Sequence, residues 1–182
     1  MGDRAENLRR ATAELRKKGR LVAVSSAYET EPMYRADQAW FLNSVAVLET
    51  GEEPGDLLRW MKETEVRLGR PERGERNAPR KIDLDLLLYG DAVLSTEDVQ
   101  VPHPRIAERA FVLAPLAEIR PGMLHPVIRK TAAELLEQVG DRYKVVKAGP
   151  SSSRPRPRAR HGASPRRRAS SPGKRRSSPR RR

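Results

Sequence analysis

The 182 residues suit one ordinary globular domain with an added segment, and they carry a formal net charge of +13 and no cysteine. The lack of cysteine excludes disulfides, thiolate metal sites and thiol nucleophiles, and no apolar run approaches the roughly 18 residues of a membrane span. We therefore expect a cytoplasmic protein that is neither exported nor inserted in a membrane.

The first half of the chain predicts two helices and two strands. Asp3 stands three residues before Glu6, an N-cap pattern, and apolar residues then follow at helical spacing. Pro54 suits the first turn of a second helix. The expected elements are a helix over residues 4–18, strands over 21–28 and 41–49 around a loop that contains Pro32, and a helix from Pro54 to Gly69.

The second half adds a cationic loop over residues 70–80, with Arg70, Arg73, Arg76 and Arg80, before an apolar strand. Mixed helices and hairpin strands indicate an α+β fold. The expected elements are a strand over 82–89, a Gly90-Asp91 turn with a return strand near Val93, short helical turns over 105–116, a helix over 131–139 and a strand over 143–147.

Composition changes near residue 149. Residues 151–182 hold 13 Lys and Arg and no Asp or Glu, so they account for the whole net charge. Ser, Pro and Arg dominate and no hydrophobic period survives, so this segment cannot offset its ordering entropy by burying apolar surface. We expect a folded domain over 1–148 and a disordered basic tail over 149–182.

Asp83 and Asp85 stand two apart in an otherwise apolar strand. A period of two places both carboxylates on one face, where hard oxygen ligands suit Mg²⁺ bound together with phosphate oxygens. The alternative is a face that is simply exposed to solvent, although the cationic loop just upstream weighs against it. The pattern favours phosphoryl transfer.

Phosphoryl transfer calls for cations beside the metal carboxylates rather than for a nucleophile. Arg80, His103 and Arg109 are the candidates. His103 lies between two prolines and, taken alone, is more typical of a loop histidine than of a catalytic one. Neither common glycine-rich nucleotide motif is present, so any ATP site must be built from side chains.

Five segments in register resemble the 6-hydroxymethyl-dihydropterin pyrophosphokinases, and the similarity covers residues 2–147. They are Tyr28-Glu29-Thr30-Glu31-Pro32, Phe41-Leu42-Asn43, Asn77-Ala78-Pro79-Arg80-Lys81-Ile82-Asp83-Leu84-Asp85, Val101-Pro102-His103-Pro104, and Arg109-Ala110-Phe111-Val112-Leu113-Ala114-Pro115-Leu116.

The resemblance implies a ferredoxin-like mixed or antiparallel sheet with helices, and ATP and 6-hydroxymethyl-dihydropterin as substrates around two Mg²⁺ ions. By the same matching, Asp83 and Asp85 would bind metal and act with Arg80 in catalysis. The remaining matches are Arg70, Arg80, His103 and Arg109 for ATP, Glu72 in the mobile loop, and Thr30, Pro32, Asn43 and Phe111 for the pterin. An amide can pair with the pterin edge and an aromatic ring can stack on its face.

The chain departs from the family pattern at three places. Asn77-Ala78 replaces the usual Trp-Gly before Pro79, and Glu72 stands where Arg is usual. The family also begins with an apolar strand and a Gly-Ser-Asn turn, whereas Gly2-Asp3-Arg4 opens this sequence. A missing central strand would leave the sheet incomplete. We favour a start upstream of Met1 over a compensating arrangement.

The basic tail predicts binding to polyanions with little sequence preference, because no aromatic residue lies among its arginines. The alternative is a solvated appendage. The rival function is therefore a non-catalytic relic of the kinase that binds nucleic acid through the tail. Kinases of other small metabolites are a weaker alternative, because they give no reason for Asn43 and Phe111. We expect a monomer without membrane partners.

Overall fold

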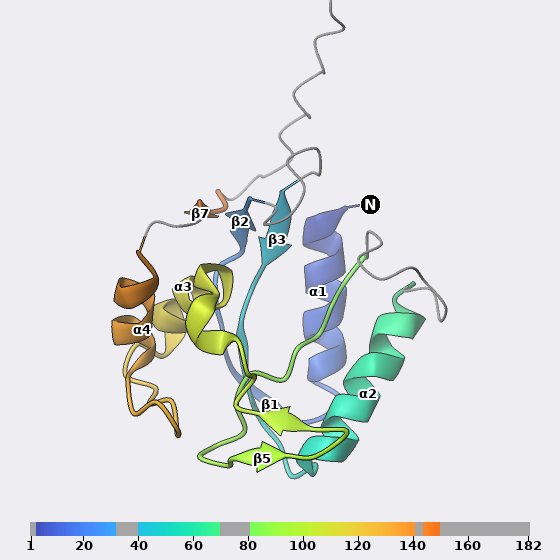
Figure 1. Ribbon diagram of the computed structural model, residues 1–182. Helices are drawn as coiled ribbons and strands as arrows, with labels where there is room; N and C mark the ends of the chain where they lie inside the picture. Colours follow the sequence, from blue (N-terminus) through green and yellow to red (C-terminus); the bar gives the residue numbers. More distant parts are fainter. Residues whose placement is uncertain (1–2, 32–39, 70–80, 141–143, 150–182) are drawn as a thin grey trace, which may run out of the picture. The chain divides into compact units, whose positions relative to one another are not determined.

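The computed structural model describes residues 3–31, 40–69, 81–140 and 144–149 (Figure 1). The chain divides into two units, Met1–Ser152 and Ser153–Arg182, and all of the described residues lie in the first. The statements below concern that unit. No helix within the described ranges is both long enough and apolar enough to cross a membrane.

Four short strands of the first half form a hairpin in two sections. β1 (Arg20–Val24) pairs antiparallel with β4 (Ala46–Glu49), and β2 (Tyr28–Thr30) pairs antiparallel with β3 (Phe41–Asn43). The two continuous strands expected from the sequence are each interrupted. At the interruption the Ser25 hydroxyl accepts the Val45 amide hydrogen at 2.9 Å. A side chain therefore replaces the backbone acceptor at this position of the strand pair.

Two helices flank this hairpin in the chain. α1 (Arg4–Leu15) is capped by Asp3, whose side chain accepts from the backbone of Ala5 and Glu6, as the N-cap pattern predicted. It ends three residues earlier than expected. α2 (Pro54–Arg67) begins at the predicted proline, and Gly69 follows it with φ +100, a conformation that favours glycine.

The second half contains β5 (Leu94–Ser95), β6 (Gln100–Val101), the 3-10 turn η1 (Ile106–Glu108), α3 (Ala110–Ile119), α4 (Ala132–Val139) and β7 (Val145–Lys147). The expected helix over 131–139 and strand over 143–147 correspond to α4 and β7. The short turns expected over 105–116 are wrong in part, because α3 is a continuous ten-residue helix. Thr131 and Glu134 cap α4 reciprocally.

The described strands form three separate antiparallel sheets, with orders β1-β4, β3-β2-β7 and β5-β6. Helices together with antiparallel sheets confirm the α+β class, whereas the ferredoxin-like arrangement stays a prediction. The strand expected over 82–89 is wrong in its pairing: among the described residues no strand pairs with it. The return strand near Val93 is β5, which pairs with β6 instead.

Two apolar clusters form the core, and α3 contributes to both. The first contains Val45, Ile106, Val112, Leu116 and Ala132, with Leu87 and Leu88 packed against it. The second joins Ala110 and Leu113 to Leu135 and Val139 of α4. The end of the 82–88 segment is therefore fixed to the core by Leu87 and Leu88.

Candidate functional site

The segment 82–88 presents its two aspartates on one side. Ile82 is buried, Asp83 and Asp85 are exposed, and Leu84 between them is half-buried. This alternation agrees with the predicted period of two. The Asp85 side chain is 47% exposed, so both carboxylates are accessible to a ligand in solvent.

Side chains of α2 and backbone groups elsewhere hold this segment, which pairs with none of the described strands. Glu65 is fully buried, and its carboxylate accepts the Leu84 amide hydrogen at 2.6 Å. The Lys62 ammonium donates both to Glu65 and to the Leu84 carbonyl, each at 2.9 Å. Further along, the Leu87 carbonyl accepts from the His103 amide at 2.8 Å. The peptide between the two aspartates is thus clamped from α2.

Three of the predicted phosphate and metal residues converge at the start of α3. Arg109 is the N-cap residue of α3, and its Nη1 lies 3.6 Å from Asp85 Oδ2 and 3.4 Å from His103 Nε2. The Arg109 guanidinium also lies 5.6 Å from the centre of the Phe111 ring, within cation–π range. Asp85, His103, Arg109 and Phe111 therefore form one cluster.

The environment of His103 favours a neutral ring. Burial and the neighbouring Arg109 lower the pKa of His103 below its usual value. Its Nδ1 accepts the Arg105 amide hydrogen at 3.1 Å, and its Nε2 lies 3.4 Å from Arg109 Nη1. His103 and Arg109 therefore lie side by side next to the Asp85 carboxylate.

Thr30 and Asn43 meet across the β2–β3 pair. The Asn43 carboxamide donates to the Thr30 hydroxyl at 2.8 Å, and Thr30 is only 4% exposed. This contact fixes the orientation of the Asn43 amide, which the pairing of Tyr28 with Asn43 places on the sheet. α3, which carries Phe111, packs beside β2 and β3, as Figure 1 shows.

The remaining predicted residues lie outside the described part of the chain: Pro32, Arg70, Glu72, Arg73, Arg76, Asn77 and Arg80. Within the described ranges no group of three or more His, Asp or Glu is placed to hold a metal ion. The two carboxylates of Asp83 and Asp85 nevertheless fit Mg²⁺ chemically, because this ion takes few protein oxygens when phosphate and water supply the others.

Sequence reasoning missed the Glu65–Lys62 clamp. Glu65 occupies the apolar stripe of α2, four residues after the buried Met61. A carboxylate on the buried stripe of a helix needs a partner, so the position was a signal. Its partner, a backbone amide in a segment 19 residues away, could not be identified from spacing.

Comparison with known proteins identifies related sequences. Residues 1–121 match the family model of 7,8-dihydro-6-hydroxymethylpterin-pyrophosphokinase. The chain is 46% identical over 121 residues to the 2-amino-4-hydroxy-6-hydroxymethyldihydropteridine pyrophosphokinase of Bacillus subtilis, which covers 65% of this chain and 72% of that protein. It is 37% identical over 134 residues to the protein of the same name from Aquifex aeolicus, covering 74% and 83%.

Longer relatives match only in part. The chain is 37% identical over 131 residues to a folic acid synthesis protein of Dictyostelium discoideum, covering 72% of this chain and 20% of that protein. A folic acid synthesis protein of Schizosaccharomyces pombe is 40% identical over 141 residues, covering 76% and 19%. The chain thus spans about a fifth of the length of these relatives.

Proposed function

Because this chain belongs to the 7,8-dihydro-6-hydroxymethylpterin-pyrophosphokinase family, we propose that it transfers the pyrophosphoryl group of ATP to 6-hydroxymethyl-7,8-dihydropterin in folate synthesis. The products are AMP and the pterin diphosphate. The observation that carries the proposal is the convergence of Asp85, His103 and Arg109 next to Asp83.

Asp83 and Asp85 are the residues that would hold magnesium, and the expected number is two ions. When bound, magnesium neutralises charge on the phosphate oxygens and orients them. The Glu65–Lys62 clamp fixes the peptide that joins the two carboxylates, so their separation is set before any ligand arrives. This preorganisation lowers the cost of assembling the charged site.

Arg109 and His103 supply the donors for the triphosphate. In the described structure Arg109 pairs with Asp85, and a phosphate oxygen would share or replace that partner. His103, whose pKa is lowered by burial and by Arg109, would contact the triphosphate without adding a charge. The pterin hydroxyl oxygen forms a bond to the β-phosphorus, the bond from that phosphorus to the AMP oxygen breaks, and the hydroxyl proton is released. Arg70 and Arg80 complete the proposed ATP contacts.

The pterin would lie between Asn43 and Phe111. The contact with Thr30 holds the Asn43 amide in one orientation, as recognition of a ring edge requires. Phe111, in the first turn of α3, offers a face for stacking. Pro32 belongs to the proposed neighbouring loop. The monomeric state and the cytoplasmic location stay predictions, and the nucleic-acid-binding relic is not favoured.

The test is pterin-dependent AMP release by the full chain. Asp83→Asn and Asp85→Asn are expected to lower kcat by at least about 100-fold, because each removes a charge that the metal site requires. Asp98→Asn is the matched control, since Asp98 is exposed in the β5–β6 turn, and it should retain activity. Pterin-independent release, or no release from a folded chain, would contradict the proposal.

A further inference from the structure

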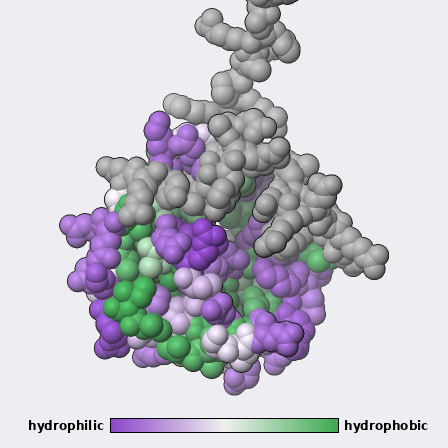
Figure 2. Space-filling view, viewed as in Figure 1, coloured by the Kyte–Doolittle hydropathy of each residue, from purple (hydrophilic) through white to green (hydrophobic). Residues whose placement is uncertain are grey.

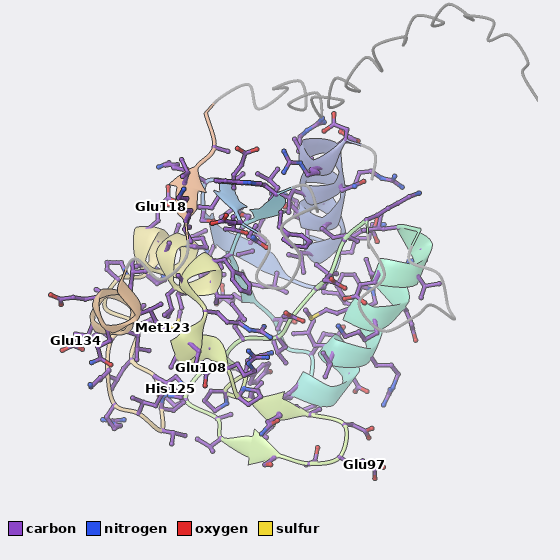
Figure 3. All side chains as sticks on the ribbon, turned by 45° about the horizontal axis from the view of Figure 1, so that its top comes forward. Glu97, Glu108, Glu118, Met123, His125 and Glu134 are labelled. Carbon is purple, nitrogen blue, oxygen red and sulfur yellow. The ribbon has the colours of Figure 1, made fainter. Side chains whose placement is uncertain are left out.

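Glu118, next to the end of α3, joins this helix to two strands. One of its carboxylate oxygens accepts the Ser26 amide hydrogen at 3.0 Å, and the other accepts from the Ser26 hydroxyl and the Lys147 ammonium, each at 2.8 Å. The Tyr28 hydroxyl adds a further hydrogen bond. Ser26 leads into β2, and Tyr28 and Lys147 lie in β2 and β7. A single carboxylate thus connects α3 to both strands, and Figure 3 shows it on the β7 side of the helix.

The strand partners of Glu118 lie in register with a proposed pterin residue. In the antiparallel pairs Tyr28 is opposite Lys147 on β7 and opposite Asn43 on β3. Residues directly opposite each other point to the same face of a sheet, so Lys147, Tyr28 and Asn43 form one row on the face toward α3. Thr30, two residues after Tyr28, belongs to the same face and contacts Asn43 at 2.8 Å. The row that Glu118 holds at one end therefore carries the Asn43 amide at the other.

The same side of α3 carries Phe111. Phe111 and Glu118 are seven residues apart, which is two helical turns and about 10.5 Å along the axis. Side chains at this spacing lie on one side of a helix. Because α3 is continuous from Ala110 to Ile119, a contact that fixes Glu118 against the strands also fixes Phe111 relative to Asn43.

Apolar packing alone defines this position less sharply. α3 meets the two core clusters through residues such as Leu113 and Leu116, and the hydrophobic effect that holds them together is non-directional. Hydrogen bonds, in contrast, weaken steeply when their distance or angle changes. Glu118 therefore defines the position of α3 along the strands more sharply than the core does.

We propose that Glu118 is a positioning residue for the pterin: through its contacts with β2 and β7 it sets the distance between the Phe111 ring and the Asn43 amide. This inference rests on the function proposed above. The distance matters because a gap of about 0.5–1 Å already forfeits roughly a quarter to a half of the attraction between two atoms in contact. A displaced α3 would therefore stack poorly on a ring that Asn43 holds by its edge.

The proposed ATP contacts should depend on Glu118 much less. Asp85 and His103 lie outside α3, and the His103 amide is held by the Leu87 carbonyl at 2.8 Å. Arg109 precedes the first residue of α3, and its side chain has many rotamers with which to follow a small shift of the helix. Loss of Glu118 should therefore weaken the binding of the pterin selectively.

The test measures binding without turnover in the full chain. The nucleotide is α,β-methylene-ATP with Mg²⁺, in which a carbon replaces the oxygen of the bond that the proposed reaction breaks, and 6-hydroxymethyl-7,8-dihydropterin is titrated by calorimetry. Glu118→Ala should raise the Kd of the pterin at least tenfold and the Kd of the nucleotide less than twofold.

Two conservative variants separate position from charge, and they carry the test if Glu118→Ala does not fold. Glu118→Gln keeps the length of the side chain and an acceptor for Ser26, so its pterin Kd should lie between those of wild type and Glu118→Ala. Glu118→Asp keeps the charge but is one methylene shorter, so it should bind the pterin no better than Glu118→Ala.

Two control variants separate position from stability. Thr131→Ala removes the cap of α4 and so destabilises the fold. Val127→Ser changes a side chain that is 59% exposed in the α3–α4 connection, over which Figure 2 shows hydrophobic surface. Both variants should bind the pterin as wild type does.

Four results would overturn the proposal while leaving the proposed function intact. They are an unchanged pterin Kd in Glu118→Ala, an equal loss of nucleotide affinity in that variant, full rescue by Glu118→Asp, and an equal loss of pterin affinity in Thr131→Ala. Wild type that binds no pterin would instead refute the proposed function, and this inference with it.

Discussion

Glu65 shows how one side chain can replace a strand partner. A segment with the period and composition of a strand normally gains its backbone hydrogen bonds from a neighbouring strand. Here the Leu84 peptide gains them from Glu65 and Lys62 on α2. The carboxylate is completely buried, so loss of its partners would leave an unsatisfied charge. The two proposed metal ligands on either side of Leu84 depend on this contact.

Glu65→Leu is therefore expected to lower both stability and turnover. Removing the carboxylate leaves the Leu84 amide without its acceptor, which should reduce the free energy of unfolding by about 1–3 kcal/mol. Urea denaturation measures this change. The proposed turnover should fall mainly in kcat, because the positions of Asp83 and Asp85 are disturbed. Glu63→Leu is the control, since Glu63 is 60% exposed on the same helix; an equal loss there would contradict the role of the clamp.

Glu118 gives the molecule a predictable response to acid. Hydrogen bonds from Lys147 and Ser26, with a smaller contribution from Tyr28, lower the pKa of Glu118 to about 2, and Figure 3 shows Glu118 beside β7. Because the pKa of Glu118 is lower in the folded state than in the unfolded state, its contribution to the free energy of unfolding is present above about pH 5 and is lost as the pH falls toward 2. Solvent screening limits it to about 1 kcal/mol.

The measurement is the free energy of unfolding of wild type and Glu118→Gln between pH 7 and pH 3. The variant should be less stable than wild type at pH 7, and the two should converge as the pH falls. Glu97→Gln in the β5–β6 turn, also labelled in Figure 3, should follow the wild-type curve. A difference between Glu118→Gln and wild type that does not change with pH would refute the assignment.

For single residues, the sequence predicted the candidate site residues better than the residues that hold them in place. Asp83, Asp85, His103 and Arg109 could be singled out because their residue types and spacing suit phosphate chemistry, and three of them meet within 4 Å. The partners that hold them could not be foreseen. Glu65 contacts Leu84 across 19 residues, and Glu118 reaches Ser26 across 92, contacts that only the folded arrangement brings about.

For helices and strands too, the sequence predicted local properties but not the contacts between elements. The predicted period of two agrees with the exposure of both Asp83 and Asp85 around the half-buried Leu84, since that property belongs to the extended backbone alone. It did not predict that none of the strands in the described ranges pairs with this segment, because pairing depends on what lies beside it. The sequence did not predict the full length of α3, which contains Pro115, although proline usually limits a helix. Pro115 is itself buried, together with Val112, Leu113 and Leu116, and this packing compensates for the preference.

The connection from α1 to β1 depends on glycine. A Cβ at Gly19 would lie 2.1 Å from the Glu49 carbonyl oxygen, far inside contact distance, so the backbone would have to move. Gly19→Ala is therefore expected to lower the free energy of unfolding by about 2 kcal/mol or more. Thermal or urea unfolding measures it. Gly122→Ala meets nothing within 4 Å and should change stability little; equal effects would show that the close approach is unimportant.

Across the whole molecule the charge is divided sharply. Residues 1–150 hold equal numbers of basic and acidic residues, and residues 151–182 carry the entire excess of 13 positive charges. The proposed active site needs only local cations such as Arg109, whereas counterion release requires many cations in one segment. Catalysis and polyanion binding should therefore be separable in this chain.

Deletion of residues 151–182 tests that separation. The shortened chain should keep pterin-dependent AMP release within about twofold of wild type, because none of the proposed site residues lies in the tail. It should lose affinity for a 20-base-pair DNA duplex, measured by fluorescence anisotropy.

In the full chain the logarithm of Kd for DNA should rise steeply with the logarithm of the salt concentration. A duplex of shuffled sequence should bind equally well, because arginines that contact phosphates do not distinguish sequences. Asp85→Asn should leave this DNA binding unchanged while abolishing turnover. If the deletion instead removed activity and spared DNA binding, the folded unit would be the binding module and the division of roles by charge would be wrong.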